Sequence, residues 1–342
     1  MRYNWKPPED WLTVETIESH TAGEPLRVIT SGLPDIEGDT ILEKRQFFKN
    51  NMDHIRKGLM LEPRGHSDMY GAILTEPTTS DGDLGVLFTH NEGYSTMCGH
   101  GIIALTKVVL DTGIIKKGEN NPEIRFDTPA GRVKATAKIQ EGKVVEVSFL
   151  NVPSFVYKDS LKLETSEFGE INFDIAFGGA FYAYLNAEEI GLEINQNNHD
   201  EFVKVGRKIK KAISDKYEIK HPYEDDLSFL YGTIFVGPPK DRTNHSSNVC
   251  VFADGEVDRS PTGTGVSGRA AIHYSKGEID KGDKITIESI LGTTFDVEIV
   301  KTTDFGNYEA IIPKVTGKAH ITGQSKFYFD PNDPLKYGFM LR

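Results

Sequence analysis

The sequence predicts a mixed α/β (α+β) protein built from two similar lobes. Three observations lead to this prediction. The chain has 342 residues, more than one small hydrophobic core usually organises. A short glycine-rich motif occurs twice, and other matches surround each copy in the same order. Within each copy, alternating apolar segments typical of strands accompany short helix-like runs.

The repeated motif is MCGHG at Met97–Gly101 and PTGTG at Pro261–Gly265. Glycines follow 15 and 20 residues after Cys98, and again 15 and 20 residues after Thr262. A Tyr-Gly pair precedes Cys98 by 28 residues, and another precedes Thr262 by 31. The period of about 160 residues is far too long for a solenoid array. We therefore expect an internal duplication.

The expected elements follow the same order in both copies. Helix-like segments are expected at 41–59, 102–110, 201–216 and 270–275, and strands at 70–74, 144–149, 231–235 and 294–300. Gly113 and Gly277 are plausible helix stops. The strand pattern of the first copy ends near Pro153. We expect a first lobe of residues 1–155, a second lobe of 156–319, and a tail, 320–342, that crosses back to the first lobe.

Composition narrows the function. Hydrophobic residues make up 38% of the chain and charged residues 26%, and the formal net charge is −12. No basic block is present, which argues against nucleic-acid or anionic-membrane partners. No run approaches the ~20 apolar residues of a membrane span, and residues 1–8 have no apolar signal core. With only two cysteines, we expect a cytoplasmic protein with reduced thiols.

Cys98 stands where a loop meets a helix-like run. A helix start presents unpaired N–H groups and the positive end of the dipole, so it binds a carboxylate and lowers a thiol pKa from about 8.5 towards roughly 3.5–7.5. A thiolate beside a carboxylate suits proton removal from the adjacent carbon. The alternative is a small buried hydrophobic side chain. Cys250, in an apolar run, is expected in a strand core.

The second copy has a hydroxyl where the first has a thiol. Gly263 and Thr264 offer a similar backbone nest for an anion. Asp258 could hold a substrate ammonium group, cap the turn or pair with Arg259, and the residues alone leave these roles open. Thr262 is typical of a helix N-cap. A catalytic threonine needs an adjacent base, and none is identifiable nearby.

Histidines near Cys98 raise the possibility of a metal site. His66 and Asp68 form a His-x-Asp pair, and His90 and His100 flank the cysteine, but none has the spacing of a zinc frame. Neither a dinucleotide-binding glycine motif nor a phosphate loop occurs. We expect no metal and no cofactor.

These motifs resemble those of the proline racemase family. Its two signatures match Met97–His100 and Asp258–Gly265, and further matches extend over nearly the whole chain, at 18–25, 62–71 and 178–183. The resemblance implies a diaminopimelate-epimerase-like fold, two pseudo-symmetric lobes with the active site in the cleft between them. It also implies catalysis without a cofactor and a possible homodimer.

The resemblance further implies a role for each site residue. Cys98 and Thr262 would occupy the two catalytic positions, and the substrate would be bound by Gly99, His100, Asp258, Gly263 and Thr264. Asp258 would hold the ring nitrogen and the other four the carboxylate, largely through backbone N–H groups. Racemases and epimerases of the family carry cysteine at both catalytic positions. Threonine at position 262 resembles the members that dehydrate trans-3-hydroxy-L-proline.

The implied reaction is dehydration to Δ1-pyrroline-2-carboxylate. Cys98 would remove the α-proton, and the backbone nests would stabilise the developing charge. In trans-3-hydroxy-L-proline the hydroxyl lies on the same face as the α-hydrogen, so we expect syn elimination on the Cys98 side. The Cys98 thiol or a water would protonate the leaving oxygen, and Thr262 would position the substrate.

Two alternatives stay open. In a hydroxyproline epimerase or proline racemase, Thr262, with water, would reprotonate the opposite face. This is less favoured because a threonine hydroxyl is a poor acid and base near neutral pH. In a non-catalytic amino-acid-binding protein the fold alone would be kept. The intact Cys98 and Asp258 argue against that role.

Overall fold

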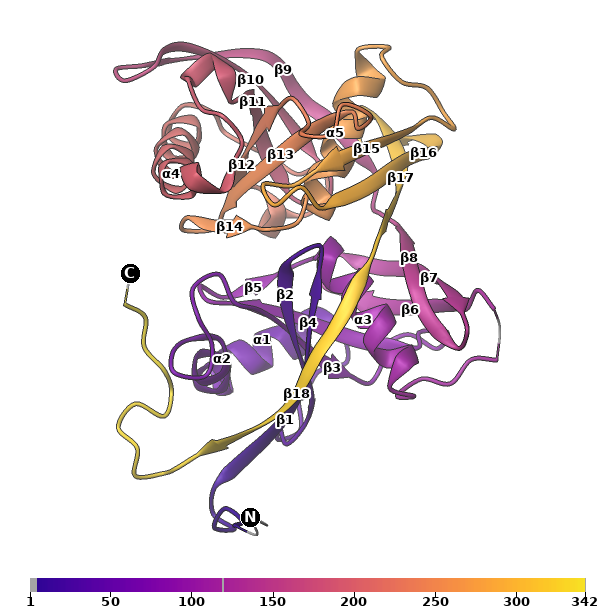
Figure 1. The fold of residues 1–342 in the computed structure, drawn as a ribbon, viewed down its shortest axis with the longest axis vertical. Coiled ribbons are helices and arrows are strands. Elements are labelled where there is room, and N and C mark those ends of the chain that lie inside the picture. Colours follow the sequence, from indigo (N-terminus) through magenta and orange to yellow (C-terminus); the bar gives the residue numbers. More distant parts are fainter. Residues whose placement is uncertain (1–4, 119, 342) are drawn as a thin grey trace.

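The computed structural model describes residues 5–118 and 120–341 and shows two lobes joined by crossing strands (Figure 1). The predicted lobe limits, 1–155 and 320–342, therefore include residues outside those described, namely 1–4, 119 and 342. The first lobe of the structure comprises β1 to β8 with β18, and the second comprises β9 to β17.

The first lobe combines a strand-rich layer with three helices. Its strands are β1 (Leu12–Thr21), β2 (Glu24–Ser31), β3 (Tyr70–Thr75), β4 (Leu84–His90), β5 (Tyr94–Ser95), β6 (Glu123–Thr128), β7 (Gly131–Gln140), β8 (Lys143–Leu150) and β18 (Ala319–Phe329). Its helices are α1 (Ile41–Asn51), α2 (Asp53–Met60) and α3 (Gly99–Asp111).

The second lobe has the same arrangement. Its strands are β9 (Ser154–Thr165), β10 (Gly169–Phe177), β11 (Phe181–Asn186), β12 (Leu230–Gly237), β13 (Ser246–Phe252), β14 (Glu256–Asp258), β15 (Lys284–Glu288), β16 (Thr294–Phe305) and β17 (Tyr308–Gly317). Its helices are α4 (His199–Lys216) and α5 (Gly263–Ser275), with short 3₁₀ turns at Glu188–Ile190, Gln196–Asn198 and Asp225–Leu227.

Strand pairing confirms the predicted duplication. In the first lobe the order is β18-β1-β2-β3-β4-β6-β7-β8, with β2–β3 and β4–β6 parallel. In the second it is β9-β10-β11-β12-β13-β15-β16-β17, with β11–β12 and β13–β15 parallel. The short β5 and β14 pair with β4 and β13. Each strand of one lobe therefore has a counterpart in the other.

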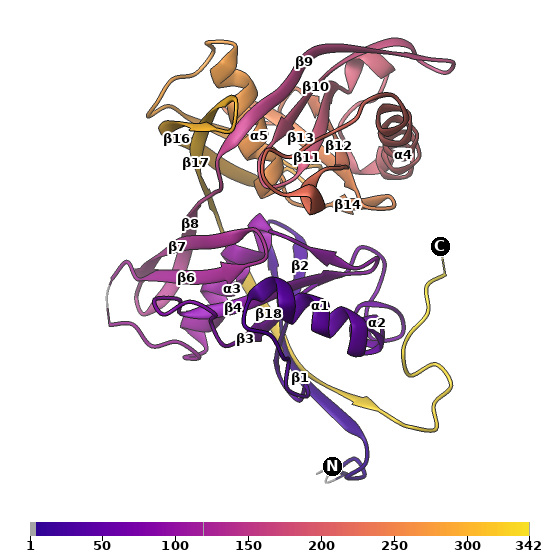
Figure 2. The same ribbon diagram turned by 180° about the vertical axis from the view of Figure 1, so that it is seen from behind.

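The strands of each lobe enclose one buried helix. Every α3 residue from Gly99 to Thr106 is buried, as is every α5 residue from Gly263 to Ile272. A helix that is buried on all sides must be apolar on all sides, which explains the run Ile102–Leu105. Helices α1, α2 and α4 pack on the outside of the lobes (Figures 1 and 2). Among the described residues, no helix is long and apolar enough to span a membrane.

Strands connect the two lobes by pairing across their boundary and by crossing it. β8 pairs with β17 of the second lobe, and β17 also pairs with β9. Beyond Gly317 the chain returns to the first lobe as β18, which pairs with β1 along its length, from Thr21↔Ala319 to Leu12↔Phe329. The yellow strand in Figure 1 makes this return visible. The positions of the two lobes are thus coupled through continuous strands.

Two helices differ from the sequence prediction. The helix expected over 41–59 is broken at Met52, whose φ of −131° ends α1 and starts α2. The break lets Arg56 pair with Asp53 at 2.6 Å while its guanidinium reaches the carbonyl of His90 at 2.8 Å. Helix α5 begins seven residues before the predicted 270, because tertiary packing overrides the low helix propensity of its glycines. A Cβ on Gly268 would lie 2.1 Å from the Tyr184 hydroxyl.

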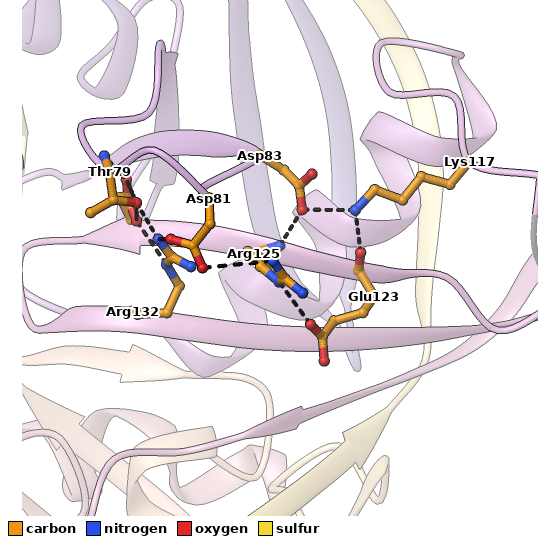
Figure 3. A network of polar contacts seen from close by, with 8 residues as sticks. Thr79, Asp81, Asp83, Lys117, Glu123, Arg125 and Arg132 are labelled. Carbon is orange, nitrogen blue, oxygen red and sulfur yellow. Dashed lines mark hydrogen bonds and ion pairs between the residues drawn. The ribbon is translucent and has the colours of Figure 1, made fainter.

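A polar network fastens the loop between β3 and β4 to the edge of the first lobe (Figure 3). Asp83 accepts hydrogen bonds from the Lys117 ammonium at 2.8 Å and from the Arg125 N–H at 2.7 Å. Arg132 binds Asp81 at 2.9 Å and buried Asp127 at 2.8 Å. These contacts fix the start of β4, the strand that ends at His90.

Candidate active site

The N-termini of α3 and α5 meet at the boundary between the lobes. A Cβ added to Gly99 would lie only 2.7 Å from the Gly263 Cα, so the two helix starts are in backbone contact. Beside this contact lies a cavity of about 30 Å³. Two sets of unpaired N–H groups and two positive dipole ends face one space, an arrangement that favours a bound anion.

All seven sequence-predicted site residues line this cavity. They are Cys98, Gly99, His100, Asp258, Thr262, Gly263 and Thr264. Sequence reasoning did not identify the other lining residues, Tyr70, Met97, Tyr182, Tyr231 and Phe252. Tyr70 and Tyr231 each begin a Tyr-Gly pair that recurs in the two copies. This recurrence could have identified both tyrosines as lining residues.

Cys98 is the N-cap of α3. Its sulfur accepts the Gly101 N–H at 3.2 Å and lies 3.3 Å from His100 Nδ1. Burial raises the pKa of Cys98 well above its usual range, the Gly101 hydrogen bond opposes this, and the Asp258 carboxylate adds to it. Desolvation thus outweighs the helix terminus, and the shift runs opposite to the lowering expected from the helix start alone.

His100 presents its side chain, and not only its backbone, to the site. Burial lowers the pKa of its imidazole to about 3, although a hydrogen bond to the Pro25 carbonyl opposes the shift. The ring is therefore neutral near pH 7 and lies against the Cys98 sulfur. The His100 carbonyl accepts a hydrogen bond from the Thr21 hydroxyl at 2.8 Å.

Thr262 precedes α5 but does not cap it. Its φ is +68° and its ψ 101°, and its side chain makes no capping hydrogen bond. A positive φ is unfavourable for a β-branched residue. The Thr262 hydroxyl is buried without a hydrogen-bond partner of normal geometry. Thr262 thus stands at the N-cap position that the sequence suggests, but its side chain does not cap the helix.

Asp258 ends β14 and is buried. Its Oδ1 accepts the Ser260 N–H at 2.7 Å. Burial raises the pKa of Asp258 from 3.8 to about 6, while Ser260 and Thr262 oppose the shift. Arg259 hydrogen-bonds Glu24 of the first lobe instead, through its N–H at 2.7 Å and its guanidinium at 3.4 Å. Of the three roles left open, Asp258 caps the turn with one oxygen.

Hydroxyl groups from both lobes line the rest of the cavity. Tyr70 of β3 donates a short hydrogen bond to Ser95, and Ser95 lies 3.1 Å from the hydroxyl of Tyr231 in β12. The Tyr182 hydroxyl lies 2.8 Å from Thr264 Oγ1. A larger groove of about 570 Å³ borders this side and shares Met97 and Tyr231 with the cavity.

The other histidines and cysteine take structural positions. His90 Nδ1 lies 3.3 Å from buried Glu256 of the second lobe, and His66 contacts the neighbouring Ser67 carbonyl at 2.7 Å. Cys250 is fully buried in β13, as expected. Within residues 5–118 and 120–341, no group of three or more His, Cys, Asp or Glu side chains is placed to hold a metal ion.

Comparison with known proteins identifies relatives over almost the full length. A family model described as proline racemase matches residues 16–340. The chain is 48% identical over 341 residues to a trans-3-hydroxy-L-proline dehydratase of Colwellia psychrerythraea, covering 99% of this chain and 96% of the relative. It is 42% identical over 330 residues to a 3-hydroxyproline 2-epimerase of Burkholderia multivorans, covering 96% and 98%.

A solved structure confirms the two-lobed fold class. The crystal structure of a hydroxyproline epimerase from Agrobacterium vitis, with bound trans-4-hydroxy-L-proline, matches with a TM-score of 0.91 and 30% identity. The match covers 98% of this chain and 96% of that one.

Proposed function

The chain belongs to the proline racemase family, and we propose that it dehydrates trans-3-hydroxy-L-proline to Δ1-pyrroline-2-carboxylate. The observation that carries the proposal is the cavity between the two helix starts, where one thiol, Cys98, shares the lining with a hydroxyl, Thr262. Removal of the α-proton needs one base, whereas inversion of the α-carbon needs an efficient proton donor on the other face as well.

The substrate is bound by complementary charge. Its carboxylate occupies the space in front of the two helix starts, where the N–H groups of Gly99, His100, Gly263 and Thr264 have no helical partner. Its ring ammonium pairs with Asp258. This pairing has a second effect, because it compensates the Asp258 charge that raises the pKa of Cys98. Substrate binding thus favours the thiolate that the reaction needs.

In the proposed reaction, Cys98 and Thr262 act on opposite faces of the substrate. The Cys98 thiolate removes the α-proton, and the helix N-termini stabilise the negative charge that spreads onto the carboxylate. The 3-hydroxyl leaves on the same face, and the enamine tautomerises to the pyrroline. Thr262 contacts the substrate from the second lobe and orients it.

Proton NMR of the protein with trans-3-hydroxy-L-proline tests the proposal. We expect substrate signals to be replaced by those of Δ1-pyrroline-2-carboxylate, and Cys98→Ser to abolish the change. Accumulation of cis-3-hydroxy-D-proline without pyrroline would contradict dehydration.

The second candidate is a 3-hydroxyproline 2-epimerase, which the name of the Burkholderia multivorans relative favours. In this reaction a donor on the Thr262 side would reprotonate the α-carbon. Incubation in heavy water distinguishes the two functions, because an epimerase would place solvent deuterium at the α-carbon of the epimer, whereas a dehydratase would release pyrroline.

A further inference from the structure

The proposed dehydration leaves one proton without an assigned donor. Hydroxide is a poor leaving group, so the 3-hydroxyl must be protonated as its C–O bond breaks. In trans-3-hydroxy-L-proline that oxygen projects from the same face as the α-hydrogen, towards Cys98 and the first lobe. The donor should therefore come from the part of the cavity lining that surrounds Cys98.

Three protic side chains of the first lobe line this region: Cys98, His100 and Tyr70. Cys98 is occupied with the α-proton. The pKa of His100, lowered to about 3 mainly by burial, leaves its imidazole neutral, and a hydrogen bond joins it to the Pro25 carbonyl. The Tyr70 phenol is the remaining donor, and its burial keeps it protonated by raising its pKa well above 10.

The position of Tyr70 suits this task. Its ring meets the His100 ring edge-on at 4.8 Å and stacks on His90 at 5.7 Å. His90 is in turn held by Glu256 at 3.3 Å. Tyr70 and Cys98 line the same cavity, and His100, which the Tyr70 ring contacts, lies with its Nδ1 3.3 Å from the Cys98 sulfur. A rigid phenol thus lies beside the group that receives the α-proton.

The Tyr70 hydroxyl also belongs to a chain that crosses between the lobes. It donates to Ser95, which lies 3.1 Å from the Tyr231 hydroxyl. Tyr70 and Tyr231 occupy equivalent positions in the duplicated strands β3 and β12. Because hydroxyl hydrogens rotate, Ser95, which accepts from Tyr70 in this structure, can donate to it once Tyr70 turns to a substrate oxygen.

We propose that Tyr70 is the catalytic acid that protonates the departing 3-hydroxyl, an inference that rests on the proposed dehydration. The Cys98 thiolate takes the α-proton and the electron pair moves to the α-carbon. As the Cα–Cβ double bond forms, the C–O bond breaks, and the oxygen takes the Tyr70 proton and leaves as water. The Cys98 thiol then returns its proton to the Tyr70 phenolate. The cycle closes with no other reactant consumed.

This assignment differs from the sequence-based expectation that Cys98 or a water supplies the proton. Tyr70 and Cys98 line the same cavity of about 30 Å³, so the proton can return from the thiol to the phenolate within that cavity. Ser95 and Tyr231 act as positioning residues, because Ser95 bonds the Tyr70 hydroxyl and Tyr231 lies against Ser95.

The decisive experiment compares two leaving groups in Tyr70→Phe. Fluoride departs without a proton, whereas hydroxide does not, and both trans-3-fluoro-L-proline and trans-3-hydroxy-L-proline yield the same pyrroline. We expect Tyr70→Phe to lose about 100-fold or more of the rate with the hydroxyl substrate. With the fluoro substrate it should stay within about threefold of the wild-type rate.

A kinetic isotope effect gives an independent readout with the natural leaving group. With trans-3-hydroxy-L-proline deuterated at the α-carbon, Tyr70→Phe should show a smaller isotope effect than the wild type, because loss of the hydroxyl becomes slower than proton removal. A lower rate with an unchanged isotope effect would overturn the assignment.

Tyr184→Phe is the matched control. Tyr184 is also a buried tyrosine of a strand beside the site, but its hydroxyl is bonded to the Gly265 carbonyl at 3.0 Å and it does not line the cavity. We expect wild-type rates with both substrates.

If Tyr70→Phe lowered both rates equally, the role of Tyr70 would be structural or limited to activating Cys98. If it kept the hydroxyl rate, Cys98 or water would be the acid. A wild type unable to dehydrate the hydroxyl substrate would instead refute the proposed function.

Discussion

At the scale of single residues, Cys98 and Thr262 hold equivalent positions with different backbones. Cys98 is extended, with φ −144° and ψ 108°, and its sulfur accepts a hydrogen bond from its own helix. Thr262 has φ +68°, and its hydroxyl makes no such bond to α5. An unfavourable conformation persists only where the surroundings enforce it. The asymmetry therefore belongs to the site, and it supports the proposal that proton transfer takes place on the Cys98 side.

Substitution of the two residues should separate their roles. We expect Cys98→Ser to lower kcat by about 10³-fold or more, because a serine hydroxyl ionises far less readily than a thiol. Thr262→Val should cost less than about tenfold, since it removes only a positioning group. Turnover of trans-3-hydroxy-L-proline measures both, and Cys250→Ala, in the core of β13, controls for loss of a buried thiol. Equal losses in Cys98→Ser and Thr262→Val would refute the division of roles.

The raised pKa of Asp258, about 6, sets an expected pH dependence. Substrate binding needs the carboxylate, which is protonated below this pKa and charged above it. We therefore expect kcat/KM to rise from about pH 5 to pH 7. Because Thr262 helps to lower the pKa of Asp258, Thr262→Val should move this limb to higher pH. If kcat/KM did not change between pH 5 and pH 7, Asp258 would not control substrate binding. If Thr262→Val did not shift the rise in kcat/KM, another group would be responsible for it.

At the scale of elements, the contact between α3 and α5 builds the anion site. Neither helix could approach the other with a side chain at its first residue, because a Cβ on Gly99 would meet the Gly263 backbone and the Phe149 ring at 2.7 and 3.2 Å. Backbone atoms cannot rotate away as a flexible side chain can. The glycines therefore fix the distance between the two sets of N–H donors.

Gly99→Ala tests this contact. The added methyl group should hold the lobes apart by a fraction of an ångström and lower kcat/KM by about 10²-fold, since misplacement on this scale disrupts catalytic geometry. Gly93→Ala is the matched control, as no atom lies within 4 Å of a Cβ at that position. Similar kinetics for the two variants would show that close helix contact is unimportant.

At the scale of the whole molecule, the site exists only where the lobes meet. The Glu24–Arg259, His90–Glu256 and Ser95–Tyr231 contacts all join the first lobe to the second. The cavity of about 30 Å³ is too small for a proline ring, and it is partly open to its surroundings. We therefore predict that the lobes separate to admit substrate, with the adjoining groove near Tyr231 as the side of entry.

Small-angle X-ray scattering can detect this motion. We expect the radius of gyration of Cys98→Ser to fall when trans-3-hydroxy-L-proline is added, because the ligand joins Asp258 of one lobe to the helix start of the other. Asp258→Asn, which lacks the charge for the ring nitrogen, should show no fall at the same concentration. An unchanged radius in Cys98→Ser with bound ligand would contradict a separation and closure of the lobes.

The duplicated fold was predictable from the sequence alone, and so were seven residues that the structure places around one cavity. Glycine spacing, the Tyr-Gly pairs and the change from Cys98 to Thr262 are local patterns, and local patterns survive in the sequence. The predicted lobe limits, the cytoplasmic location and the homodimer stay predictions. The tertiary structure decided the rest. The pKa of Cys98, the positive φ of Thr262, the pairing of Arg259 with Glu24 and the chain from Tyr70 to Tyr231 depend on burial and contact between residues far apart in sequence. Residues of both lobes line the cavity, and each lobe shields the other's lining residues from water. These shifts and contacts therefore depend on how the two lobes pack together.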